Sequence, residues 1–264
     1  DSRPSKLALD YAIQMSTMVS DLHYVLLHIQ PMVSLILKEE ARTSVSARKK
    51  KEEISNRNAR LGQALLDRYH DDMTGRGIAP DRIEVMNRER RLGFAKDIID
   101  VAQQGYFDAL VVGRRGLSGI AKLYSGSVTA NILEQSQVIP VWLVDGEAGP
   151  GKLMIAADGS EASLRAVDHV SFLMSGDTET TVTLVHVKSN ARNTCGIEVE
   201  DAPDTELEDI IVRGDKACID QFYSRALKKF TQAGMAEERV RFETIEGRIR
   251  IGKAIMDYAE KGGY

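Results

Sequence analysis

The feature that most constrains the fold of this chain is an internal repeat. At one constant offset the segment 26–30 (LLHIQ) aligns without a gap with 184–188 (LVHVK). An offset one residue shorter aligns 95–107 with 252–264. Near the start of the chain the first offset pairs Ser2, Ser5, Ala8 and Asp10 with Ser160, Ser163, Ala166 and Asp168. Because both offsets keep the same order along the chain, we interpret the sequence as two copies of one domain in tandem.

The two copies do not cover the same part of the repeat. The first has no counterpart of the apolar segment 152–158, and the second ends at Tyr264, before a counterpart of the last two strands of the first. The stretch 145–152 (DGEAGPGK) is rich in glycine and has the composition of a linker. We therefore expect domain 1 over residues 1–147 and domain 2 over residues 152–264.

Short apolar segments alternate with amphipathic segments along both copies. In the first copy, 24–29 and 109–113 are apolar runs typical of strands that are buried on both faces. Residues 3–19 and 94–104 carry apolar side chains at helical spacing, and a further helix is expected from about Ile54. Strands separated by helices predict βαβ units. The expected class is therefore α/β, with two doubly wound, Rossmann-like domains built on parallel sheets.

Composition and charge make several classes of function unlike this chain. The formal net charge of −4 gives no basic footprint for nucleic acid, and no apolar run approaches the ~20 residues that span a bilayer. The five histidines are scattered and show no metal-ligand spacing. A chain of this length needs no disulfide, so Cys195 and Cys218 are interpreted as reduced thiols. We expect a cytoplasmic protein that binds no nucleic acid, membrane or metal cluster.

A glycine-punctuated loop, VVGRRGLSGIAKLYSGS at residues 111–127, is the main candidate for a binding site. It follows an apolar strand and ends at a predicted helix, but it lacks the Gly-Lys-Ser/Thr of a Walker loop. Gly113 and Gly116 permit close approach of the backbone, and Ser127 suits a helix N-cap. Free N–H groups at a helix start favour an anion such as phosphate. The alternative is a tight turn whose serine only caps the helix.

The spacing Gly113-x2-Gly116-x9-Gly126-Ser127 resembles the nucleotide-binding motif of the universal stress protein (Usp) family, within the nucleotide-binding α-hydrolase-like (HUP) superfamily. DGSEASLRAVDHV and the strand ends LLHI and LVHV resemble the same family, and the tandem resemblance covers essentially the whole chain. For this family the resemblance implies five-stranded parallel sheets in the order 3-2-1-4-5. It also implies ATP as a regulatory ligand, with or without Mg²⁺, and pairing through the last strand, between the two domains or in a homodimer.

The resemblance also implies which residues hold an adenine nucleotide. The glycine motif and its neighbours would contact ribose and phosphates, and the residue after each strand-end histidine would meet adenine through its backbone. An acidic residue ends the first strand, which only the second copy contains. By number these expected ligands are Ile29, Gly113, Arg114, Gly116, Gly126, Ser127, Val128, Asp158 and Val187.

Other polar residues that recur in both copies have simpler interpretations. We expect His28 and His186 to be hydrogen-bonded packing residues at strand ends, and Asp10 and Asp168 to face solvent or a neighbouring strand. No nucleophile, base and orienting group can be placed together, so a sensor or carrier is expected rather than an enzyme. Two alternatives stay open: an interaction module of the same fold, and an enzyme that hydrolyses ATP slowly or transfers an adenylyl group.

Overall fold

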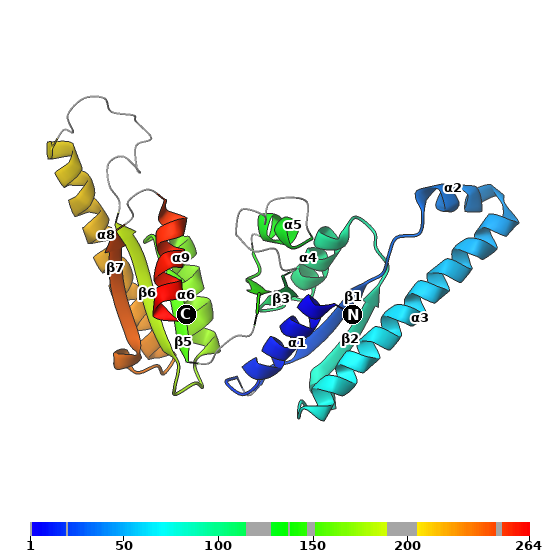
Figure 1. Cartoon of the computed structure of the whole chain (residues 1–264), viewed down its shortest axis with the longest axis horizontal. Coiled ribbons are helices and arrows are strands. Elements are labelled where there is room, and N and C mark those ends of the chain that lie inside the picture. Colours follow the sequence, from blue (N-terminus) through cyan, green and yellow to red (C-terminus); the bar gives the residue numbers. More distant parts are fainter. Residues whose placement is uncertain are drawn as a thin grey trace. The chain divides into compact units, whose positions relative to one another are not determined.

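The computed structural model describes residues 2–19, 21–114, 128–136, 138–146, 151–188, 205–246 and 250–264. The chain divides into two compact units, unit 1 over residues 1–148 and unit 2 over residues 149–264. Each unit alternates helices with parallel strands (Figure 1). The chain therefore has an α/β fold with parallel sheets.

Unit 1 contains two sheets of two strands each, in which β1 pairs with β2 and β3 pairs with β4. Its elements are α1 (Arg3–Met15), β1 (Tyr24–Ile29), α2 (Leu35–Thr43), α3 (Val45–Gly75), η1 (Pro80–Arg82), β2 (Ile83–Arg88), α4 (Phe94–Gln104), β3 (Leu110–Gly113), α5 (Val128–Gln135) and β4 (Val141–Val144). Side chains of α1, α3 and β2 form one buried cluster that includes Leu9, Met73 and Ile83. Apolar packing of α1 against α3 is thus part of the core of this unit.

Unit 2 contains one parallel sheet of three strands in the order β5-β6-β7. Its elements are β5 (Lys152–Ala156), α6 (Glu161–Leu173), β6 (Thr181–Lys188), α8 (Thr205–Gln232), η3 (Glu237–Arg239), β7 (Val240–Glu246) and α9 (Ile251–Gly262). The central strand β6 is buried at every position from Val182 to Val187. Burial of consecutive residues means that both faces of this strand are covered, as is usual for parallel sheets.

The described residues form smaller sheets than the expected five-stranded ones. In unit 2, β5 pairs with β6, and β6 is the repeat counterpart of β1. Unit 1 has no counterpart of β5 in the sequence. Its strands accordingly form two separate pairs, β1–β2 and β3–β4.

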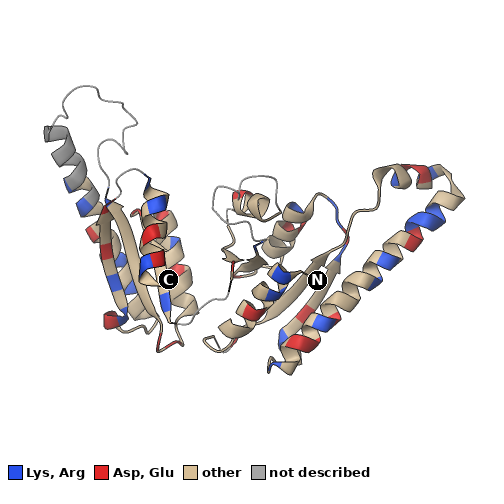
Figure 2. Cartoon of the chain, in the orientation of Figure 1, with Lys and Arg blue, Asp and Glu red and all other residues tan. Residues whose placement is uncertain are grey.

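Two helix boundaries differ from the sequence expectation because serine side chains set them. The helix expected from about Ile54 begins at Val45, where Ser44 is the N-cap and its Oγ accepts a hydrogen bond from the Ala47 N–H at 3.2 Å. The first helix ends at Met15 rather than at residue 19, and the Ser16 hydroxyl donates to the Ile13 carbonyl at 2.6 Å. Acidic and basic side chains alternate along α3, as on a solvated helix (Figure 2).

Paired positions of the repeat make the same capping contact in both units. Ser2 is the N-cap of α1 and accepts a hydrogen bond from the Ser5 N–H, and Ser160 is the N-cap of α6 and accepts one from the Ser163 N–H. Each contact satisfies a backbone donor that has no partner within the helix. The serines that the repeat aligns therefore begin equivalent helices.

The two recurring aspartates also have equivalent partners. Asp10 on α1 forms an ion pair with Arg76, just after α3, and Asp168 on α6 forms one with Lys229 on α8. In both units the pair joins the first helix to the second. The expectation that these carboxylates face solvent or a strand was wrong in this respect, because each reaches a basic side chain at the neighbouring helix.

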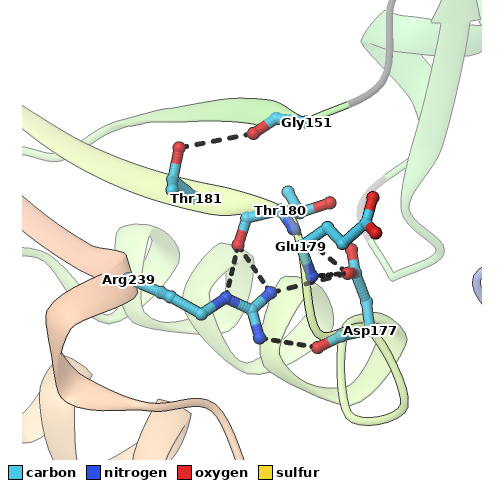
Figure 3. A network of polar contacts seen from close by, with 6 residues as sticks. All are labelled: Gly151, Asp177, Glu179, Thr180, Thr181 and Arg239. Carbon is cyan, nitrogen blue, oxygen red and sulfur yellow. Dashed lines mark hydrogen bonds and ion pairs between the residues drawn. The ribbon is translucent and has the colours of Figure 1, made fainter.

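Figure 3 shows a polar network that holds the amino ends of β6 and β7 together. The Arg239 guanidinium donates to the Thr180 carbonyl through Nε at 2.9 Å and Nη2 at 2.6 Å, and to the Asp177 carbonyl at 2.7 Å. It also lies 3.5 Å from the Asp177 carboxylate, which is almost fully buried. In unit 1 the counterpart pair, Arg82 and Asp21, lies 3.5 Å apart and is far more exposed. The buried version therefore has the larger structural role.

Replacement of Arg239 by lysine should destabilise unit 2. Lysine keeps the charge but lacks the fork that binds two carbonyl groups, so we expect a loss of about 2 kcal/mol in the free energy of unfolding. The denaturation midpoint of the full chain measures it. Arg241→Lys, at an exposed position of β7, is the control. Equal midpoints for Arg239→Lys and Arg241→Lys would show that the network contributes little.

Candidate functional site

The predicted glycine loop starts at the carboxyl end of a parallel strand and ends at the start of a helix. Gly113 is the last residue of β3, and Val128 is the first residue of α5. Carboxyl ends of parallel strands are where ligands bind in open α/β sheets. The remaining motif residues lie outside the described residues: Gly116, Gly126 and Ser127.

Gly113 has a packing role of its own. A Cβ atom built at this position would collide with the carbonyl group of Pro4 in the first turn of α1. The absence of a side chain therefore lets α1 lie directly against the end of β3. Substitutions at Gly113 would disturb this contact as well as any ligand.

Arg114 forms an ion pair that the sequence did not reveal. Its Nη1 donates to Oδ2 of Asp145 at 2.6 Å, and its backbone N–H donates to the Val144 carbonyl at 2.8 Å. The Arg114 side chain is only 16% exposed, whereas that of Asp145 is 50% exposed. The signal available in the sequence was the place of Asp145, directly after the strand β4 that pairs with β3.

A shallow hollow of about 350 Å³ lies beside this ion pair on α1 and β4. The rings of Tyr11 and Trp142 meet edge to face there, with centroids 5.8 Å apart. Burial raises the pKa of the Tyr11 hydroxyl, so this group stays neutral at physiological pH. The lining residues are Tyr11, Trp142, Leu143, Val144, Asp145 and Gly146.

The strand-end positions expected to meet adenine are well ordered by pairing. Ile29 is the buried last residue of β1 and lies opposite Arg88 of β2. Ile29 therefore belongs to the β1–β2 sheet, whereas Gly113 and Arg114 lie at the end of the β3–β4 sheet. In unit 2, Val187 is buried on β6, one strand away from β5.

The strand-end histidines are packing residues, as the sequence predicts. His186 is buried, and its Nδ1 lies 3.0 Å from the carbonyl oxygen of Ala157, at the end of β5. His28 packs against α3 at Gly62, where a Cβ would lie 2.6 Å from the imidazole Cδ2. Burial lowers the pKa of His28, which favours the neutral ring.

Asp158 follows β5 and organises the start of α6. Its Oδ1 accepts hydrogen bonds from the Ser160 N–H at 3.0 Å and from the Ser163 hydroxyl at 2.6 Å. These hydrogen bonds from Ser160 and Ser163 lower the pKa of Asp158 to about 2. The residue expected to meet a nucleotide in domain 2 is thus also part of a helix cap, with a charged carboxylate.

The charged form of Asp158 should therefore stabilise the folded chain. Folding lowers its pKa from 3.8 to about 2, so the stabilisation is complete above about pH 4 and is lost as the pH falls toward 2. Titration of the side-chain carboxyl by NMR should show this low pKa, and Ser163→Ala should raise it. Ser171→Ala, whose hydroxyl donates to the Asp168 carbonyl instead, should leave it unchanged. An unshifted pKa in Ser163→Ala would contradict the assigned hydrogen bond.

Two searches of the described residues found no further site. No group of three or more His, Cys, Asp or Glu side chains in this part of the chain is arranged to hold a metal ion. None of its helices is both long and apolar enough to cross a membrane. Cys218, the cysteine within the described ranges, is a free and exposed thiol.

Comparison with known proteins identifies the family. The sequence profile of the universal stress protein family matches residues 1–145, more than half of the chain. The chain belongs to the universal stress protein family. No curated protein sequence gives a significant match to it.

Solved structures show the same fold at low sequence identity. A universal stress protein from Archaeoglobus fulgidus has a TM-score of 0.58 at 16% identity, with 99% of this chain and 79% of that chain covered. A family protein from Burkholderia pseudomallei has a TM-score of 0.32 at 18% identity, covering 44% of this chain and 79% of its own. A universal stress protein in complex with cAMP has a TM-score of 0.27 at 16% identity, covering 43% and 66%.

Proposed function

We propose that unit 1 binds ATP or another adenine nucleotide as a regulatory ligand of a stress-response protein. The observation that carries the proposal is the position of the glycine motif. The motif begins at the carboxyl end of β3 and ends at the first residue of α5, in a chain that belongs to the universal stress protein family. Helix starts and glycine-rich turns at such an edge supply backbone N–H groups for phosphate.

Under this proposal the nucleotide is held mainly by backbone groups. Phosphates would lie between Gly113, Arg114 and the N-terminus of α5 at Val128, while adenine would meet the backbone at Ile29. Nothing in this arrangement aims a base or a nucleophile at the γ-phosphate. The ligand would therefore act by favouring one conformation of the chain, which requires different affinities for two conformations.

A second nucleotide in unit 2 would meet Asp158 and Val187, at the ends of β5 and within β6. The counterpart of the glycine motif is not part of this sequence. The proposal for unit 2 is limited to this partial site. Tandem duplication, pairing of the two domains, homodimerisation and a cytoplasmic location stay predictions of the resemblance.

Gly126→Val should abolish nucleotide binding. A branched side chain at the phosphate end of the motif would block close approach of the ligand, so we expect ATP affinity to fall at least about tenfold. Isothermal titration of the full chain with ATP, with and without Mg²⁺, measures this change. Gly113 is unsuitable for the test because its substitution would also displace α1.

The matched control is Gly75→Ala, at the end of α3, where a Cβ would meet no atom within 4 Å. This variant should bind ATP like the wild type. Absence of binding in the wild type would favour an interaction module instead. Steady-state ATP turnover that disappears in Gly126→Val would favour the enzyme.

A further inference from the structure

The positive side chain nearest to the expected phosphates already has an anionic partner within the chain. Nη1 of Arg114 and Oδ2 of Asp145 lie 2.6 Å apart, a distance typical of a strong charge-assisted hydrogen bond. Arg114 is mostly buried, so its guanidinium is not a freely solvated surface group. Pairing of Gly113 with Val144, and of the Arg114 N–H with the Val144 carbonyl, holds both residues at the ends of neighbouring strands.

Such an arrangement sets a carboxylate in competition with a phosphate. A guanidinium binds carboxylate and phosphate oxygens through the same N–H groups. A phosphate that uses Nη1 of Arg114 must therefore displace Asp145 or lie close to its negative charge. Either outcome costs free energy, and the cost rises with the charge that the ligand carries.

We propose that Asp145 is a specificity-determining residue of the nucleotide site, which competes for Arg114 and thereby disfavours ligands with more phosphate charge. This inference rests on the proposed function of the glycine loop. Asp145 does not contribute to the recognition of adenine or ribose. Its effect is therefore largest for ATP, smaller for AMP and absent for adenosine.

Isothermal titration of the full chain with ATP, AMP and adenosine tests the proposal. Asp145→Asn keeps the shape of the side chain but removes its charge, so ATP should bind about three- to tenfold more tightly. Adenosine affinity should not change. Asp108→Asn is the matched control, because it removes the same charge at an exposed position before the amino end of β3, roughly 20 Å along the strand from Arg114.

The same titrations in an Arg114→Ala background show whether Asp145 acts through Arg114. In that background Asp145→Asn should have no further effect on ATP affinity. An equal gain with and without Arg114 would overturn the proposal, as would unchanged or weaker ATP binding by Asp145→Asn alone. In both of these cases wild-type binding would leave the proposed function standing. Absence of nucleotide binding by the wild type would overturn the proposed function and this inference together.

Discussion

Parallel pairing of buried strands is the constraint on which the rest of this structure depends. It brings the carboxyl ends of neighbouring strands to one edge, so residues distant in the sequence become neighbours there. Arg114 and Asp145 meet because β3 and β4 run in the same direction and end together. Asp158 reaches the start of α6 at the equivalent edge of unit 2, beside β6.

The contacts that the two units share explain which repeated residues matter for folding. The aligned serines cap α1 and α6, and the aligned aspartates tie these helices to the next helix of each unit. An arginine before the third strand of the repeat reaches an aspartate before the second in both units. In unit 2 this pair is buried and also binds backbone carbonyls, so the same residue types contribute more there than on the surface of unit 1.

Local patterns predicted much of the secondary structure. The apolar run 24–29 is β1, and the amphipathic segment 94–104 is α4, with the same bounds as expected. Boundaries were less predictable where a cap decides them, as at Ser44 and Ser16. The packing role of His186 could be inferred because its strand is apolar on both sides of it, which leaves a buried ring that needs one hydrogen-bond partner.

The sequence by itself determined the alternation of strands and helices, the repeat and the place of the glycine motif, because hydrophobic period, caps and glycine spacing are local properties of the chain. Only the tertiary structure decided what those residues touch. It gave Arg114 an internal carboxylate, set Gly113 against Pro4 and buried Asp177 beside Arg239. These contacts depend on which strand ends and helices meet in space, and no spacing along a single chain encodes that choice locally.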